Sequence, residues 1–187
     1  VESRTQPAKL PIGFMLSLEG ADSIVTLQHL ERSYNDGLRA VGLAHYGPGL
    51  YAHGTDASGP LPARGKDLLK EMRQLGIILD VTHLCDECFW DALDYFDGPL
   101  WASHQNCRTL CSGERQFPDE ILNRIIERGA VIGASMDTYM IYSKGTEWDY
   151  IKPRREVFGC EEVTLEHLVD HIDYVCQLAG NSLHSAI

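Results

Sequence analysis

Five short apolar runs, each ending at a polar side chain, constrain the fold of this chain more than any other feature. Segments of helical periodicity separate the runs, which cover residues 13–19, 38–44, 77–82, 100–103 and 130–136. Strands that are apolar along their whole length and alternate with helices indicate a parallel sheet that helices cover on both faces. The polar residues at the ends of the runs are Glu19, His45, His83, His104 and Asp137.

Helices are expected between these runs and after the last one. The first is expected to begin near Ser23, with Asp22 or Ser23 as its cap, and to end at Gly37. Apolar side chains recur on one face in the other expected helices, which cover residues 66–75, 85–96, 118–128 and 165–179. The stretch 46–65 is rich in glycine and proline, which predicts a long functional or mobile loop.

Two architectures contain such a sheet, and the polar strand ends favour one of them. An open doubly wound sheet usually carries a glycine-rich phosphate turn, which these strand ends lack. In a (β/α)8 barrel the catalytic groups come from the C-terminal ends of several strands, and the ends here recur about every 30 residues, the size of one barrel unit. We therefore expect a single TIM-barrel-type domain over residues 1–187 that holds about five of the eight units and is truncated at both ends. A sixth strand is expected to begin within residues 184–187.

Composition and charge exclude several functions. Sixteen lysines and arginines stand against 27 aspartates and glutamates, and the resulting net charge of −11 disfavours binding to nucleic acid or anionic membranes. No apolar run approaches the roughly 20 residues of a membrane helix, and residues 1–11 lack the order of a signal peptide. The six cysteines are too dilute for a disulfide scaffold, so we expect reduced thiols and a cytoplasmic protein. A homo-oligomer is compatible with these features.

Three of the strand ends carry side chains that bind metal ions. Glu19, His83 and His104 follow different strands, and the ends of parallel strands converge at one rim of a barrel. Imidazole nitrogen suits zinc, and a carboxylate can bridge two cations. Each residue taken alone is more often a capping or loop residue, but their alignment predicts a metal site made of all three.

The same segments resemble consecutive motifs of the renal or membrane dipeptidase family of zinc peptidases. They occur in register over nearly the whole chain and comprise Leu16–Asp22 (LSLEGAD), Val41–His45 (VGLAH), Leu79–Leu84 (LDVTHL), Ala102–Glu120 (ASHQNCRTLCSGERQFPDE) and Val131–Ser135 (VIGAS). This resemblance implies a (β/α)8 barrel with two zinc ions that hydrolyses dipeptides by means of a metal-activated water.

The resemblance also implies a role for each matching residue. Glu19 would bridge the two zinc ions, and His83 and His104 would bind the second one. His45 would lie over the scissile carbonyl and stabilise its oxyanion, while Arg115 would pair with the free carboxylate of the substrate. The residue types fit these roles, because two bridged cations lower the pKa of a shared water and a guanidinium matches a carboxylate bidentately.

Two parts of the family's site have no counterpart in the sequence. In the family, a His-x-Asp pair on the first strand holds the first zinc, and a further aspartate near the last strand binds the substrate amine. His171 and Asp173 have the His-x-Asp spacing, but they fall in a predicted helix, where residues two apart point in different directions, so we reject them as that pair. His167 and His171 share one helix face, which we expect to be solvated.

Several other interpretations stay open. Two closely spaced thiol pairs could together bind a structural zinc: Cys85 with Cys88, and Cys107 with Cys111. Each pair could instead form a redox disulfide, although no thioredoxin-like sequence surrounds either pair. The substrate could be an N-acyl or β-lactam amide, because the motifs specify the metal chemistry better than the pocket. The chain could instead be an inactive or partial barrel that serves as a binding or structural element. Residues 148–155 lie in a long connection that we expect to be a lid.

Overall fold

Parallel strands form the centre of the molecule, for which a computed structural model describes residues 12–141 and 163–181. The strands are β1 (Leu16–Leu18), β2 (Leu38–Gly42), β3 (Ile78–Asp80), β4 (Leu100–Ala102) and β5 (Val131–Ile132). Each pairs in parallel with the next, so the sheet order is β1-β2-β3-β4-β5. The predicted parallel α/β sheet with five strands is thereby confirmed.

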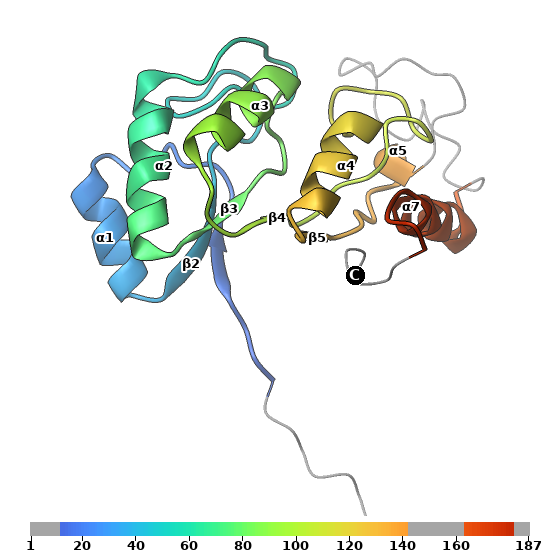
Figure 1. Cartoon of the computed structure of the whole chain (residues 1–187), viewed down its shortest axis with the longest axis horizontal. Helices are drawn as coiled ribbons and strands as arrows, with labels where there is room; N and C mark the ends of the chain where they lie inside the picture. The colour runs from blue at the N-terminus through green and yellow to red at the C-terminus, as the bar shows by residue number, and fades with distance from the viewer. Residues whose placement is uncertain (1–11, 142–162, 182–187) are drawn as a thin grey trace, which may run out of the picture.

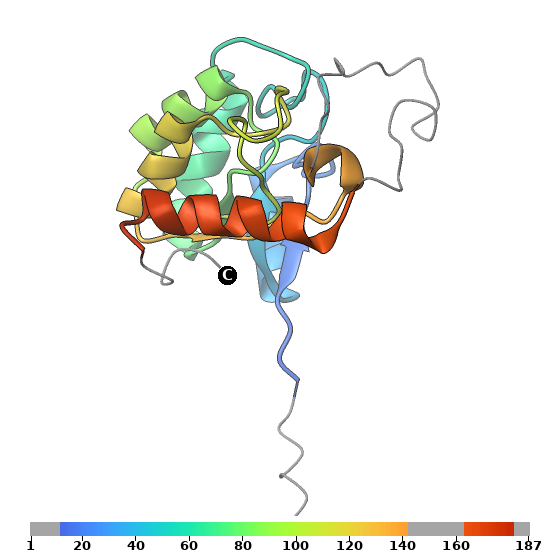
Figure 2. The same cartoon turned by 90° about the vertical axis from the view of Figure 1, so that its right-hand side faces the viewer.

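The helices cover one face of this sheet. Those between the strands are α1 (Leu27–Asn35), α2 (Ala63–Leu75), α3 (Asp86–Tyr95) and α4 (Asp119–Glu127), and α5 (Thr138–Ile141) and α7 (Leu165–Leu178) follow β5. Right-handed crossovers between successive neighbouring strands place the connecting helices on the same side of a sheet, and α2, α3 and α4 lie there together (Figures 1 and 2). The fold is thus a section of a (β/α)8 barrel. A doubly wound sheet is excluded because its strand order reverses. The expectation of helices on both faces is not met among the described residues, where α2, α3 and α4 share one face.

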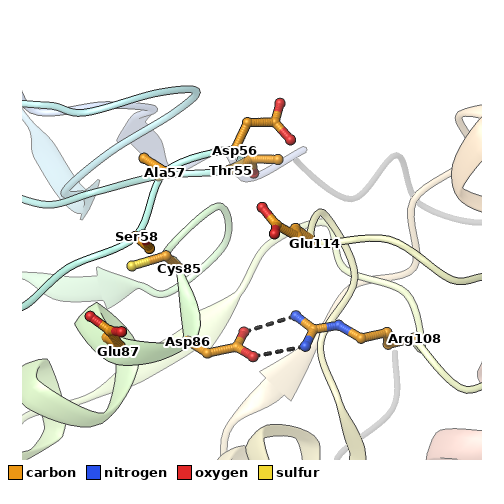
Figure 3. A pocket seen from close by; sticks show the side chains of 10 residues that line it. Thr55, Asp56, Ala57, Ser58, Cys85, Asp86, Glu87, Arg108 and Glu114 are labelled. Atoms are coloured by element: carbon orange, nitrogen blue, oxygen red, sulfur yellow. Dashed lines mark hydrogen bonds and ion pairs between the residues drawn. The ribbon is translucent and has the colours of Figure 1, made fainter. Parts of the chain in front are cut away.

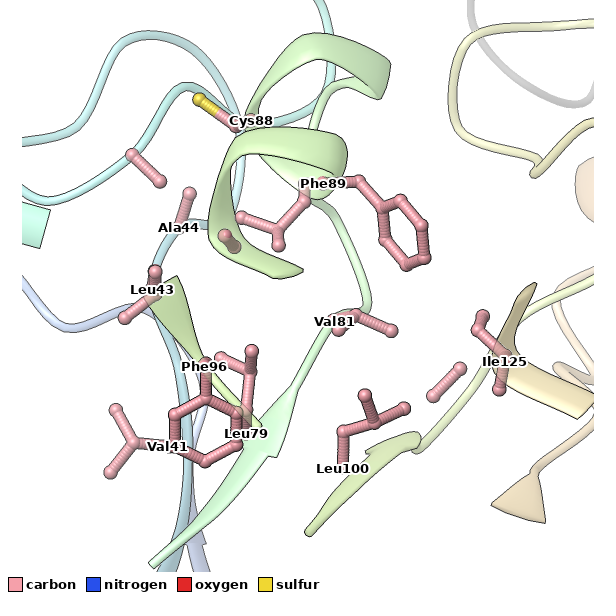
Figure 4. Packing of buried hydrophobic residues seen from close by; sticks show 14 of the residues in the cluster. Val41, Leu43, Ala44, Leu79, Val81, Cys88, Phe89, Phe96, Leu100 and Ile125 are labelled. Carbon is pink, nitrogen blue, oxygen red and sulfur yellow. The ribbon is translucent and has the colours of Figure 1, made fainter. Parts of the chain in front are cut away.

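The buried core lies between the sheet and these helices. Val41, Leu79 and Leu100 occupy neighbouring register positions on β2, β3 and β4. They belong to one buried cluster with Phe89 of α3 and Ile125 of α4 (Figure 4). Fully burying an apolar side chain of this size stabilises a fold by roughly 1.5–3 kcal/mol. The strand positions that face the helices therefore hold the sheet in place.

The opposite face of the sheet is more polar and more exposed. Asp80, Trp101 and Val131 are register partners on this face of β3, β4 and β5. Asp80 is buried, Trp101 is half-buried and Val131 is 43% exposed. In a closed barrel this face is the interior, where side chains from all strands pack together. The described strands build one section of that interior.

Several element boundaries differ from the expected ones because side chains take over backbone hydrogen bonds. Helix α1 begins later than expected, since Thr26 caps it by accepting a hydrogen bond from the backbone N–H of His29. Strand β5 ends at Ile132 rather than Met136. There the amide side chain of Asn106 pairs with both the N–H and the C=O of Ser135, which removes these groups from the sheet ladder.

Helix α7 departs from expectation at His171. This residue was expected on a solvated face, yet it is buried. Its Nδ1 accepts a hydrogen bond from the backbone N–H of Cys107 at 3.1 Å, and its Nε2 donates to the carbonyl of Ile141 at 2.9 Å. The imidazole therefore joins α7 to the segment after β4 and to α5. Capping of α7 by Thr164, in contrast, is as expected.

Some expectations fall outside the described residues: the lid at 148–155, the sixth strand at 184–187 and the segment 1–11. None of the helices within the described ranges combines the length and the apolar character needed to cross a bilayer.

The buried position of His171 predicts a stability that depends on pH. Burial lowers the pKa of this histidine below its usual value of 6.5, so the unfolded chain binds the proton more strongly than the folded one. The contribution of His171 to the free energy of unfolding is fully present above about pH 6.5 and is lost as the pH falls below it. His171→Gln, which retains one acceptor and one donor, should make urea denaturation midpoints less dependent on pH between about pH 7 and 5.

The control for this comparison is His29→Gln, a change of an exposed side chain on α1. This variant should follow the wild-type pH dependence, including the part due to other buried histidines. Equal pH dependence for wild type and His171→Gln would contradict the assigned role of His171.

Candidate metal centre

Three polar side chains converge at the C-terminal ends of the strands. Glu19 directly follows β1, while His83 and His104 lie in the turns after β3 and β4. The Glu19 Oε1 atom lies 3.0 Å from Nε2 of His83 and 3.0 Å from Nε2 of His104. The two imidazole Nε2 atoms are 3.3 Å apart. The structure therefore brings together the three residues for which sequence predicts a metal site.

The separations among these three atoms fit a zinc ion. Zinc binds imidazole nitrogen and carboxylate oxygen at about 2.0–2.2 Å, and tetrahedral coordination then places neighbouring ligand atoms about 3.3 Å apart. The observed distances of 3.0, 3.0 and 3.3 Å are close to this spacing. Two imidazoles and one carboxylate are also among the donors that zinc prefers. The residues present thus fit the metal that the sequence implies.

His45 stands beside this triad, after β2. Its Nε2 atom is 3.8 Å from Glu19 Oε1, and its ring centroid is 4.4 Å from that of His83. Donor atoms of Glu19, His45 and His83 all lie within 4.8 Å of one another. The His45 side chain is 53% exposed, whereas that of His83 is 3% exposed. His45 can therefore reach a small molecule held against the triad.

Asp137, the fifth polar strand end, takes a different position. It is exposed, and its backbone carbonyl accepts a hydrogen bond from Met140 in the first turn of α5. Distances of 3.0–3.8 Å join the other four strand ends, Glu19 to His45, His83 and His104.

Hydroxyl groups orient the imidazoles of His83, which is buried, and of His104, which is partly exposed. The hydroxyl of Thr55 lies 3.1 Å from Nδ1 of His83, and that of Ser103 lies 2.8 Å from Nδ1 of His104. Partners on Nδ1 fix the rotation of an imidazole ring and leave Nε2 for a metal. Thr55 comes from the glycine-rich loop and was not among the predicted site residues. Ser103 was not predicted either, although it directly precedes His104.

Asp80 fixes the backbone that carries these histidines. Its buried carboxylate Oδ1 accepts hydrogen bonds from the backbone N–H groups of Thr82 and Ser103, both at 3.1 Å. These residues directly precede His83 and His104, so one carboxylate joins the two turns. His83 itself has a φ of 71°, a left-handed conformation that is uncommon for residues other than glycine. The surrounding hydrogen bonds hold this conformation in place.

The environment lowers the pKa of both histidines, which favours their neutral forms. Burial lowers the pKa of His83 to about 2, and the positive charge of Arg115 and the nearby His45 and His104 lower it further. Burial and Arg115 also lower the pKa of His104, although Glu19 opposes this shift. A neutral imidazole has the free electron pair that metal binding requires.

Arg115 approaches the centre from the segment between β4 and α4. Its guanidinium is buried and donates hydrogen bonds to Oε1 of Gln105 and to the carbonyl of His104, both at 2.9 Å. Within the part of the chain that the structure describes, no carboxylate lies within ion-pair distance of it. Nearby, the hydroxyls of Tyr46 and Tyr139 are 2.8 Å apart. Burial and this hydrogen bond raise the pKa of Tyr139.

The two cysteine pairs do not form a four-thiol zinc site. The Cys85 and Cys88 thiols both lie at the carbonyl of Gly59. The other two thiols bond elsewhere: Cys107 to the carbonyl of His171 and Cys111 to that of Tyr139. Among the described residues, the groups that could hold a metal include no cysteine. The structural zinc site considered from sequence is therefore wrong.

Comparisons with known proteins agree with this geometry. A model of the membrane dipeptidase family, peptidase family M19, matches residues 3–186. The chain is 28% identical over 180 residues to an uncharacterized protein in the PQQ-III 3′ region of Acinetobacter calcoaceticus, which covers 91% of this chain and 55% of that protein. It is 29% identical over 176 residues to the dipeptidase tcpJ of Claviceps purpurea, which covers 90% of this chain and 38% of that one.

A solved structure shows the same fold. A metallo peptidase from Rhodobacter sphaeroides, liganded with a phosphinate mimic of the dipeptide L-Ala-D-Ala, has a TM-score of 0.76 and 26% sequence identity, covering 89% of this chain and 46% of that one. The chain thus spans about half the length of the relatives it matches. The family model accounts for nearly all of its residues, and the chain belongs to the membrane dipeptidase family, peptidase family M19.

Proposed function

We propose that the protein carrying this chain hydrolyses dipeptides with zinc bound by Glu19, His83 and His104. The observation that carries this proposal is the convergence of one carboxylate oxygen and two imidazole nitrogens at 3.0, 3.0 and 3.3 Å. All three carboxylate contacts to histidine use Oε1 of Glu19. Its second oxygen makes none of these contacts and would be available to a second cation, which would need ligands beyond this triad.

The chain's own residues divide the work of such a reaction. Zinc supplies a Lewis acid that polarises a carbonyl and acidifies water. Glu19, His83 and His104 would hold it, and the hydroxyls of Thr55 and Ser103 fix the orientation of both imidazoles. His45 is exposed beside the triad, where its imidazole can donate a hydrogen bond to the oxygen of a substrate carbonyl as negative charge develops.

Arg115 supplies the selection of short substrates. A buried cation is stable only with compensating partners, and Arg115 has two neutral acceptors in Gln105 and the His104 carbonyl. A guanidinium has five N–H donors, so donors remain for an anionic partner. The free carboxylate of a dipeptide matches these donors in charge and geometry, which supports a dipeptide as substrate.

Zinc affinity of the chain itself tests the proposed ligands. His83→Ala and His104→Ala should each weaken zinc binding by at least about 100-fold, because each removes one of three ligand atoms, and even outer-shell changes cost 10–100-fold. Competition of the metal-free chain with a chromophoric chelator measures this. His29→Ala, which changes an exposed histidine on α1, should bind zinc like the wild type. Wild-type affinity in a folded His83→Ala chain would overturn the assignment.

A second variant tests the orienting role of the glycine-rich loop. Thr55→Val removes the hydroxyl on Nδ1 of His83 while nearly preserving side-chain shape. Zinc affinity should fall about 10–100-fold, as is typical for outer-shell partners of metal-binding histidines. Thr109→Val is the matched control, because its exposed hydroxyl bonds to Asp119 instead. An unchanged affinity in Thr55→Val would show that packing alone orients His83.

Arg115→Lys tests recognition of the substrate carboxylate in the complete protein. Lysine keeps the positive charge but loses the bidentate fork. KM for a dipeptide should rise about tenfold or more, since a hydrogen bond to a charged group contributes about 1.5–3 kcal/mol. KM for the same dipeptide with an amidated C-terminus should change little. Arg108→Lys, at the ion pair with Asp86, is the matched control and should leave both KM values near wild type.

A rise in KM that is equal for the acid and the amide would contradict carboxylate recognition by Arg115. It would instead indicate that the substitution disturbs Gln105 and the His104 carbonyl, which the guanidinium holds.

A further inference from the structure

Two cysteines stand together where α3 begins. Cys85 is the N-cap residue, and its Sγ accepts a hydrogen bond from the backbone N–H of Cys88 at 3.4 Å. Cys85 is half-buried, whereas Cys88 is fully buried in the first turn of the helix. One thiol of the pair is therefore accessible and the other is shielded behind it.

Both thiols share one acceptor in the glycine-rich loop. The Sγ atoms of Cys85 and Cys88 lie 3.7 Å and 3.3 Å from the carbonyl oxygen of Gly59. The Cys88 Sγ also accepts a hydrogen bond from the backbone N–H of His53 at 3.3 Å. Two sulfur atoms that converge on one oxygen lie on the same side of the helix start. The loop therefore holds the thiols close together.

Cys85, the more exposed residue of the pair, is one of the residues that line a pocket. This pocket has a volume of about 200 Å³, and Cys85 lies in its wall beside Ser58 (Figure 3). Across the pocket lie Glu114 and Arg108, and Arg108 pairs with Asp86 of α3. The pocket therefore offers a small thiol compound a route to Cys85, whereas Cys88 is buried and does not line it.

We propose that Cys85 and Cys88 form a redox-active dithiol that closes to an intrachain disulfide by exchange with low-molecular-weight disulfides. Helix residues three apart have Cβ atoms about 5–6 Å apart, and a disulfide needs about 3.5–4.5 Å. Cys85 lies outside the helix with an extended backbone, so a small shift of this one residue closes the gap. The inference is independent of the proposed hydrolytic function.

The exchange proceeds in two balanced steps. The Cys85 sulfur, as thiolate, attacks one sulfur of the small disulfide, forms a mixed disulfide and releases one thiolate. The Cys88 sulfur then loses its proton and attacks Cys85, which forms the Cys85–Cys88 bond and releases the second small thiol. The protein dithiol loses two electrons, and the small disulfide is reduced to two thiols. Closure also removes both S–H donors from the Gly59 carbonyl.

The other short-spaced pair offers an internal comparison. The Cys107 and Cys111 thiols are buried and donate to carbonyls of different segments, those of His171 and Tyr139. Neither residue is among those that line the pocket. The two pairs thus differ in their access to the pocket and in whether their thiols share one acceptor. Only Cys85 and Cys88 should therefore exchange with a small disulfide.

The test treats the reduced, metal-free full chain with oxidised glutathione and maps the products by mass spectrometry of non-reduced peptides. The wild type should lose two of its six thiols to a Cys85–Cys88 disulfide that dithiothreitol reverses. Cys88→Ser should stop at the mixed disulfide on Cys85, and Cys85→Ser should lose this reaction. The double variant Cys107→Ser/Cys111→Ser should react like the wild type.

Three results would overturn the proposal. One is a wild-type chain that forms no Cys85–Cys88 disulfide while the urea-unfolded chain does. Another is a wild-type chain that stops at the mixed disulfide, because Cys88 would then not reach Cys85. The third is a Cys107–Cys111 disulfide that forms as fast as the Cys85–Cys88 disulfide. The wild-type measurements decide the question even where a variant fails to fold.

Discussion

The hydrogen bonds between hydroxyl groups and the Nδ1 atoms of His83 and His104 are the interactions on which the metal centre depends. A hydroxyl both donates and accepts, so Thr55 and Ser103 can hold His83 and His104 in either tautomer. Without a cation, an Nε2–H group can donate to Glu19. A bound cation would need the electron pair of Nε2, so the ring proton would then sit on Nδ1. The same hydroxyl oxygen would accept a hydrogen bond from this Nδ1–H group. The ring positions therefore need not change when metal binds.

The fold supplies this arrangement through its strand order. Because each strand pairs with the next one in sequence, every turn after a strand opens at the same rim, and Glu19, His45, His83 and His104 meet there. The helix-facing positions of the strands carry the apolar core. The opposite face carries Asp80, whose single carboxylate oxygen joins the turns that bear both metal-facing histidines. Core and site thus use alternate residues of the same short strands.

The sequence predicted the parts of this structure that follow from periodicity and order along the chain. Apolar runs and their polar ends identified the sheet, the barrel-type topology and the triad of Glu19, His83 and His104. Partners set by tertiary contacts were not predictable: Thr55 reaches His83 from a loop 28 positions away, and His171 is buried by segments far from it in sequence. Asp137 was misplaced because backbone pairing with the β4 segment ends after Gly133, and Asn106 takes both backbone groups of Ser135.

The burial of Arg115 relates the binding site to the rest of the fold. Removing a guanidinium from water is costly, and burial lowers its pKa although nearby Tyr139, Tyr46 and Glu19 oppose the shift. Two neutral acceptors fix its position before any ligand arrives. Arg115 is held rigidly, and no carboxylate of the described chain pairs with it. An anionic ligand would therefore supply the negative charge that stabilises the buried guanidinium. One of its acceptors is the carbonyl of His104. A single hydrogen bond therefore joins Arg115, which is proposed to select the substrate, to His104, which is proposed to bind zinc.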